Sequence, residues 1–168
     1  MRYLILFLAL LWPGNGYACL HDCQLNDNGY ILLKHAEGLR LFPYRDVAGH
    51  ETDGFGHLVL PGEHFPIPLT GPQALAILQA DVAERTPTVN KMIAIALPED
   101  SWGSLFDFAY NLGTNTLKKS TLLKRVNQGE NELVHDEFMK YCYADHKIIK
   151  GLWLRRQAEA TLYDEGVP

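Results

Sequence analysis

The stretch from Glu37 to His57, EGLRLFPYRDVAGHETDGFGH, decides the fold of this chain. It begins where a helical pattern ends, because Gly38 is a natural helix C-cap and residues 26–28 (NDN) upstream offer N-caps. After Gly38, glycines and a proline separate short apolar and aromatic pieces, which is typical of brief antiparallel strands. The stretch therefore predicts a helix ending near Glu37, followed by two or three strands between residues 39 and 60.

Helical signals dominate the rest of the chain. Thr70 and Gln73 form a capping box that opens a helix to about Arg85. Pro87 and Pro98 are expected to separate the later segments. Further helices are predicted over 102–112 (ended by Gly113), over 121–128 (between Ser120 and Gly129), near 132–141 and near 152–165. The fold class is therefore α+β, with a small hairpin lobe and a larger helical lobe.

Length and composition indicate one packed domain and narrow the classes of function. At 168 residues the chain is long enough for one core and too short for two. Its 47% apolar and 21% charged residues predict a globule rather than a disordered chain. Fifteen Lys and Arg against 20 Asp and Glu give a net charge of −5. This balance disfavours a dedicated nucleic-acid binder, which carries a basic stripe.

The first 18 residues have the layout of a secretory signal. Arg2 is followed by the uncharged run 3–12, a proline, and small residues up to Ala18. We expect cleavage after Ala18, export through the inner membrane to the periplasm and cell wall, and a folded domain over 19–168. Three alternatives stay open: an uncleaved membrane tether that later leaves the bilayer, lipid attachment at Cys19, and a buried core element.

Three cysteines, Cys19, Cys23 and Cys142, remain in the exported chain. An oxidising compartment favours disulfides, and an odd number leaves one sulfur over. One pairing joins Cys23 to Cys142. The other is a local bridge between Cys19 and Cys23, with Cys142 buried and free, and the sequence does not distinguish the two.

Two carboxylates in the opening stretch are candidates for acid–base chemistry. Glu37 lies at a helix end, and Asp46 lies on the predicted hairpin. Hydrolysis of a glycosidic bond needs such a pair: a protonated acid for the leaving oxygen and a carboxylate on the opposite side of the sugar. The negative end of the helix dipole and the apolar neighbours of Glu37 both raise its pKa. They therefore favour the proton-bearing form that a general acid requires.

The residues around this pair carry a family signature. Eight residues separate Glu37 from Asp46, and five separate Asp46 from Thr52. With the neighbouring residues, this block resembles the signature of the phage-type lysozymes, or endolysins. The resemblance continues over 108–113 (FAYNLG), 120–129 and 151–159. The matched positions of the block are Glu37, Gly38, Tyr44, Asp46, Gly49, Thr52, Gly54, Gly56 and His57.

The resemblance implies a fold, a reaction and a role for each residue. It implies a lysozyme-like fold with the active-site cleft between the lobes. It also implies hydrolysis of the β-1,4 bond between N-acetylmuramic acid and N-acetylglucosamine in peptidoglycan, with inversion, for host cell lysis. Glu37 matches the general acid, Asp46 the carboxylate that orients or activates the attacking water, and Thr52 the hydroxyl that holds this water. Arg155 matches an arginine behind the catalytic glutamate, with Arg156 as a substitute.

The remaining expectations concern supporting residues, cofactors, binding partners and alternative functions. His57 is predicted to be a supporting hydrogen-bonding residue rather than a base. His50 and Glu51 begin like a zinc motif, but Gly54 stands at the second ligand's position, so neither metal nor cofactor is expected. The expected partner is the glycan strand, bound by a monomer that contacts membrane only through its N-terminal segment. The rivals are a lytic transglycosylase acting on the same bond and a catalytically silent wall-binding protein.

Overall fold

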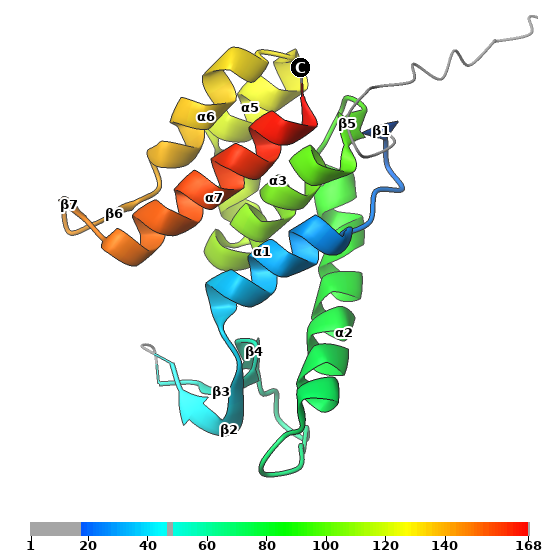
Figure 1. Cartoon of the computed structure of the whole chain (residues 1–168), viewed down its shortest axis with the longest axis vertical. Coiled ribbons are helices and arrows are strands. Elements are labelled where there is room, and N and C mark those ends of the chain that lie inside the picture. The colour runs from blue at the N-terminus through cyan, green and yellow to red at the C-terminus, as the bar shows by residue number, and fades with distance from the viewer. Residues whose placement is uncertain (1–17, 47–48, 168) are drawn as a thin grey trace, which may run out of the picture.

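The computed structural model describes residues 18–46 and 49–167, which form a helical body with a small sheet at one end (Figure 1). α3 packs against α1, α4 and α7 and is the central helix of this body, while α2 runs from the sheet along its side. The fold is α+β, as predicted. In chain order the helices are α1 (Asp27–Glu37), α2 (Gly71–Asn90), α3 (Glu99–Leu112), α4 (Thr114–Lys119), α5 (Thr121–Gln128), α6 (Asn131–Met139) and α7 (Lys150–Gly166).

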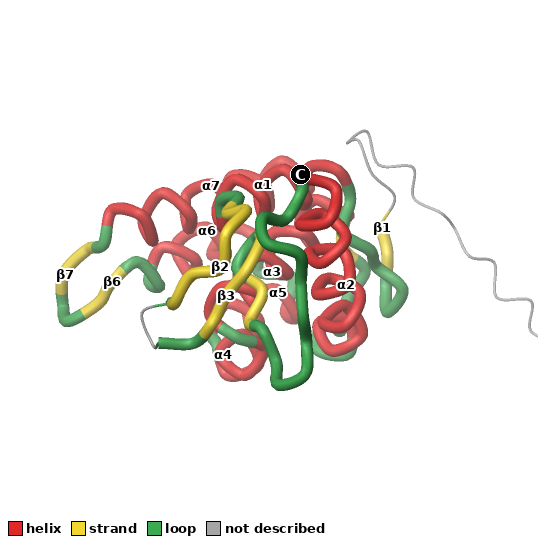
Figure 2. The backbone as a smooth tube through the Cα atoms, turned by 90° about the horizontal axis from the view of Figure 1, so that it is seen from below, coloured by secondary structure: helices red, strands yellow, loops and turns green. Residues whose placement is uncertain are grey.

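The sheet contains the strands predicted after Gly38. β2 (Arg40–Arg45), β3 (Glu51–Gly54) and β4 (His57–Leu58) are antiparallel neighbours in that order. Thr52, in the central strand, lies opposite Tyr44 on one side and Leu58 on the other. Seen from below, the three strands lie in front of the helices (Figure 2).

Aromatic side chains of α3, α6 and α7 form much of the core. Trp102, Phe108, Phe138 and Tyr163 are fully buried. The rings of Phe108 and Phe138 meet edge to face at 5.8 Å, and Phe138 lies 6.2 Å from Tyr163. α3 is therefore enclosed on most sides, and a polar residue within it is taken out of water.

Local capping signals place several helix ends where they were predicted. Ser120 accepts the Leu123 N–H at its hydroxyl, 3.0 Å away, and Gly129 ends the same helix in the left-handed region at φ +71°. Thr70 and Gln73 make the reciprocal bonds of a capping box at the start of α2.

The prediction that Pro87 separates two segments is wrong, because α2 continues through it to Asn90. The proline removes one amide donor from the helix, but one bond within the helix and one to a distant residue hold the residues on either side of it. Thr86 donates its hydroxyl to the Val82 carbonyl at 2.8 Å, and Asn90 donates its side-chain amide to the Cys23 carbonyl at 3.0 Å. These contacts offset the backbone hydrogen bond that the helix loses at Pro87. The sequence pattern shows only that loss and therefore predicts a break.

Two short strand pairs and one short helix were not predicted. β1 (Ala18–Cys19) pairs with β5 (Leu97–Pro98), and β6 (Tyr143–Ala144) pairs with β7 (Lys147–Ile148). Strands of two residues are too short to show an alternating pattern. α4 is only six residues long.

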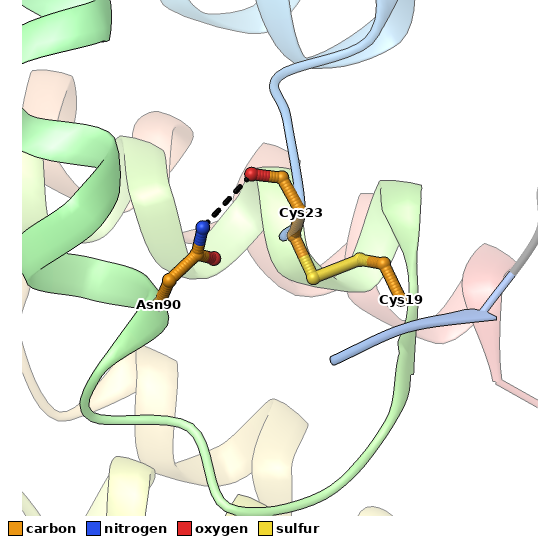
Figure 3. The surroundings of a disulfide bond; sticks show 3 residues. All are labelled: Cys19, Cys23 and Asn90. Carbon is orange, nitrogen blue, oxygen red and sulfur yellow. Dashed lines mark hydrogen bonds between the residues drawn. A yellow bond between two sulfur atoms is a disulfide. The ribbon is translucent and has the colours of Figure 1, made fainter. Parts of the chain in front are cut away.

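The disulfide joins Cys19 to Cys23, and Cys142 is free and buried (Figure 3). The alternative pairing of Cys23 with Cys142 is therefore wrong. Lipid attachment at Cys19 is also incompatible with this bond, because the same sulfur would have to form the thioether. Within 18–46 and 49–167, no helix has the length and apolarity needed to cross a bilayer. The predicted signal segment up to residue 17 lies outside the described residues.

Candidate active site

Glu37 is the last residue of α1, and its side chain is 18% exposed. Gly38 follows at φ +70° and donates its N–H to the Lys34 carbonyl, which ends the helix. Burial raises the pKa of the Glu37 carboxyl above its usual range, and neighbouring Arg155 opposes this effect without cancelling it. Desolvation by burial, which the apolar neighbours of Glu37 predict, is the main cause of this shift.

Arg155 of α7, rather than Arg156, contacts Glu37. Its Nη2 lies 2.8 Å from Oε1 of Glu37. The same guanidinium holds Asp107 of α3 through Nε at 2.8 Å and Nη2 at 3.1 Å. Arg156, the next residue on α7, turns inward instead and binds Glu159 and the side-chain oxygen Oδ1 of Asn111, the latter at 3.0 Å. Arg155, Arg156, Asp107 and Glu159 are called the arginine cluster below.

The turn between β3 and β4 brings the sheet against the Glu37 carboxyl. Gly56 in this turn has φ +82°, and a Cβ at this position would lie 3.1 Å from Oε2 of Glu37. Only glycine combines this backbone conformation with so close an approach. The hairpin stretch and the helix end therefore meet where the sequence predicted.

Asp46 and Thr52 lie on the two sides of the turn that joins β2 to β3. Asp46 accepts the His50 N–H at 2.8 Å and lies 3.4 Å from the His50 ring. Thr52 is only 4% exposed and donates its hydroxyl to the His50 carbonyl at 3.2 Å. These bonds fix both side chains relative to one local turn, of which residues 47 and 48 are outside the described part.

The pKa of the Tyr44 hydroxyl is affected by carboxylates from both lobes. Burial raises the pKa of Tyr44, Arg40 lowers it, and the negative charges of Glu37, Asp46 and Asp53 raise it further. The Arg40 guanidinium lies 4.4 Å from the centre of the Tyr44 ring. Glu37 and Asp46 therefore act on the same hydroxyl, from the helix end and from the hairpin.

His57 connects three parts of the molecule and is not free to act as a base. Its Nδ1 lies 2.9 Å from Asp81 of α2, and its Nε2 lies 3.1 Å from Glu63 of the following loop. Asp81 also accepts the Tyr110 hydroxyl at 3.1 Å and lies 3.8 Å from Arg85. Both ring nitrogens of His57 therefore have carboxylate partners, and its supporting role in the reaction stays a prediction. The five residues are called the histidine network below.

Asp107, Glu159 and Asp81 carry only weak signals in the sequence. Asp107 is an acid inside the apolar run of α3, and Glu159 follows Arg155 by four residues, which is one helical turn. Asp81 precedes Arg85 by the same spacing, but its hydrogen-bond partners come from β4 and α3. Across 18–46 and 49–167, no cluster of three His, Cys, Asp or Glu side chains is arranged to hold a metal ion.

Glu37 is a largely buried acid at a helix end, where it contacts Arg155 and lies against the glycine turn of the three-stranded sheet. This is the arrangement that the resemblance to lysozymes implied for an α+β protein. The Phage lysozyme family model matches residues 34–159, and the chain belongs to this family. It is 35% identical over 126 residues to a SAR-endolysin of Bacteriophage PS119, covering 73% of each chain. It is 33% identical over 145 residues to an endolysin of Acyrthosiphon pisum secondary endosymbiont phage 1, covering 84% of this chain and 98% of that one.

Solved structures support the same assignment. The endolysin of Escherichia coli O157:H7 phage FAHEc1 superposes with a TM-score of 0.75 at 30% identity, over 84% of this chain and 94% of that one. A variant of P22 lysozyme superposes with a TM-score of 0.73 at 26% identity. The resemblance predicted from the opening stretch is therefore confirmed at the level of family and fold.

Proposed function

We propose that this protein is an exported muramidase, which hydrolyses the β-1,4 bond between N-acetylmuramic acid and N-acetylglucosamine for host cell lysis. Its family supports the broader class, a lysozyme-type enzyme that degrades peptidoglycan. The finer proposal depends on one observation: the Glu37 carboxyl is largely buried, has a raised pKa and lies against the hairpin. We propose that the glycan strand binds where the two lobes meet.

In this proposal Glu37 donates its proton to the departing glycosidic oxygen. The raised pKa extends the pH range over which Glu37 keeps this proton. Once the proton has left, the carboxylate is stabilised by Arg155, whose Nη2 is already 2.8 Å from Oε1. The same contact therefore serves the anion that forms during the reaction more than the neutral acid that precedes it.

Asp46 and Thr52 are assigned to the attacking water. Asp46 orients or activates the water as a carboxylate, and the Thr52 hydroxyl, whose own proton goes to the His50 carbonyl, accepts a hydrogen bond from it. Attack from the face opposite Glu37 inverts the anomeric centre, which requires roughly 6.5–9.5 Å between the two carboxyl groups. What supports this division of roles is that Glu37 and Asp46 both act on the pKa of Tyr44, one from the helix end and one from the hairpin.

Export brings the enzyme to its substrate. The names of several relatives, SAR-endolysin, favour the uncleaved tether over cleavage after Ala18. The intact mass of the exported protein separates the two, because cleavage removes residues 1–18 and a tether keeps them.

The test is Glu37→Gln, which keeps the shape of the side chain and removes its acidic proton. On purified peptidoglycan we expect turnover to fall by about 10²–10⁴-fold with unchanged thermal unfolding. Glu51→Gln is the matched control. It alters an exposed glutamate of β3, in the hairpin, and should keep activity. Near-normal turnover by the Glu37 variant would exclude the acid role.

The fragments released by the wild type decide the reaction. Hydrolysis leaves reducing muramic ends, whereas a lytic transglycosylase leaves anhydro ends because no water enters. Anhydro ends would overturn the muramidase assignment, and the release of no fragments would indicate a silent wall-binding protein.

A further inference from the structure

A small pocket lies on the face of the sheet away from Thr52. Successive side chains of a strand point to opposite faces of its sheet, so Asp53, the neighbour of Thr52 in β3, points to the other face. Residues from the loop that leads from β4 toward α2 (Figure 1) form the opposite wall. The pocket between strand and loop has a volume of about 110 Å³.

Apolar side chains form half of the lining of this pocket, and a buried carboxylate lies beside them. The carboxylate is that of Asp53, which is only 2% exposed. Glu51, Glu63 and His64 complete the polar part of the lining. The apolar side chains are those of Pro43, Val59, Phe65 and Ile67.

Asp53 has no cation to pair with in the described part of the chain. Its Oδ1 accepts the N–H of Gly54, the next residue, at 3.1 Å, and this is its one hydrogen bond within 18–46 and 49–167. A carboxylate taken out of water is unfavourable unless a cation or hydrogen-bond donors compensate it. Oδ2 of Asp53 is therefore available to a donor that enters the pocket from outside the chain.

The other charged groups of the lining are engaged elsewhere or lie in solvent. Oε2 of Glu63 accepts the Leu60 N–H at 2.8 Å and lies 3.1 Å from Nε2 of His57. Glu51 and His64 are exposed, so water screens their charges. The charge of a bound ligand is therefore assigned to Asp53 alone, and Glu51 remains a surface residue at the edge of the pocket.

One buried carboxylate beside apolar walls fits an alkylammonium group better than a metal ion. Ca²⁺ and Mg²⁺ take about six or more oxygen ligands, and the described residues contain no cluster arranged to hold a metal. A protonated amine donates up to three hydrogen bonds, and its methylene groups can lie along apolar side chains. At roughly 30 Å³ for a water-sized group, a pocket of about 110 Å³ holds the nitrogen and two or three carbon atoms.

We propose that this pocket binds a primary alkylammonium group, whose nitrogen pairs with Oδ2 of Asp53 while its carbon chain lies against Val59 and Phe65. A lysine-type side chain of a peptide carries such a group, and so does a free diamine. The site goes beyond the proposed function, because it lies on the other face of the sheet from Thr52 and its occupancy is measured without turnover.

The first experiment is a nitrogen-15 NMR titration of the full chain with butylamine, at a pH where the amine is protonated. We expect saturable shifts at Gly54, whose N–H is bonded to Asp53, and at Val59 and Phe65. 1-Butanol has the same carbon chain without the charge and should bind at least about tenfold more weakly. Equal binding of the two probes, or no saturable shift with butylamine, overturns the proposal.

The second experiment compares two variants. Asp53→Asn keeps an oxygen that can accept the Gly54 N–H and removes the charge, so the affinity for butylamine should fall by about 10–100-fold. Glu51→Gln is the matched control and should bind butylamine within about twofold of the wild type. Equal losses in both would mean a general attraction to the acidic surface and overturn the proposal. If Asp53→Asn does not fold, the comparison of butylamine with 1-butanol on the wild type decides.

Two further probes identify the source of the ammonium group. Tighter binding of Nα-acetyl-lysine amide than of cadaverine would assign the pocket to a peptide side chain, and the reverse order would assign it to a free diamine. Both outcomes support an alkylammonium site. Calcium chloride that produces the same saturable shifts as butylamine would reassign Asp53 to an inorganic cation and overturn the proposal.

Discussion

Two polar networks meet beside Glu37, and they differ in what pH does to them. The arginine cluster is buried in the helical body and carries guanidinium charges that persist at any physiological pH. The histidine network joins the hairpin to α2 and α3 through His57, which is 14% exposed and whose pKa is raised above its usual value by its carboxylate partners. The arginine cluster places charges beside Glu37, and the histidine network attaches the hairpin lobe to the helical body. A change in pH should therefore loosen the hairpin before it alters the cluster.

The sharpest test of the arginine cluster is Arg155→Met. It leaves three carboxyl groups near one another with Arg156 as the remaining cation. We expect the free energy of unfolding, measured by urea denaturation, to fall by about 3–5 kcal/mol. Lys140→Met is the control, because Lys140 is 61% exposed and its buried partner Glu137 keeps Arg125 at 3.9 Å, so its loss should be about 1 kcal/mol or less. Equal losses in the two variants would mean that the cluster is no more important to stability than a surface pair.

The histidine network is tested by His57→Gln across a range of pH. Asp81 and Glu63 outweigh burial and raise the pKa of His57 in the folded state. The charged pairing therefore stabilises the fold fully below the unfolded pKa of about 6.5 and is lost as pH rises through the higher folded value. We expect the variant to lose about 1–2 kcal/mol at pH 5 and less at pH 9.

Urea denaturation at several pH values measures this difference. His135→Gln serves as control, since His135 pairs with Asp164 at an exposed site and should cost about 0–1 kcal/mol. A His57 deficit that grows toward alkaline pH would reverse the sign of the argument and remove the charged pairing as its cause.

The smallest effect on stability is expected at the glycine turn, where activity is the informative measurement. Gly56→Ala and Gly62→Ala both place a side chain at positive φ, +82° and +93°, and each should cost about 1 kcal/mol. Only the Gly56 methyl meets Glu37, at 3.1 Å, whereas nothing lies within 4 Å of the Gly62 position. Turnover on peptidoglycan should therefore fall in Gly56→Ala and stay near wild type in Gly62→Ala. Equal activity in both would show that the turn does not position the acid.

Sequence patterns predicted features whose causes are local. Ser120 and Gly129 bound α5 because a cap and a left-handed residue act within one turn. The Glu37 block was recognisable because its residues are close in the chain. The prediction of a break at Pro87 was wrong because a contact that holds this end of α2 comes from a distant residue, Cys23. Asp107 escaped for the same reason, since its pairing with Arg155 exists only once α3 and α7 pack together.

The junction before α1 has a mechanical consequence. Cys23 is linked covalently to Cys19, and its carbonyl accepts the Asn90 amide at 3.0 Å (Figure 3). The pairing of β1 with β5 adds a second attachment at the same place. A force applied to the chain ahead of residue 18 is thus carried into the end of α2 and the β5 strand, and α1, which holds Glu37, is shielded from the load.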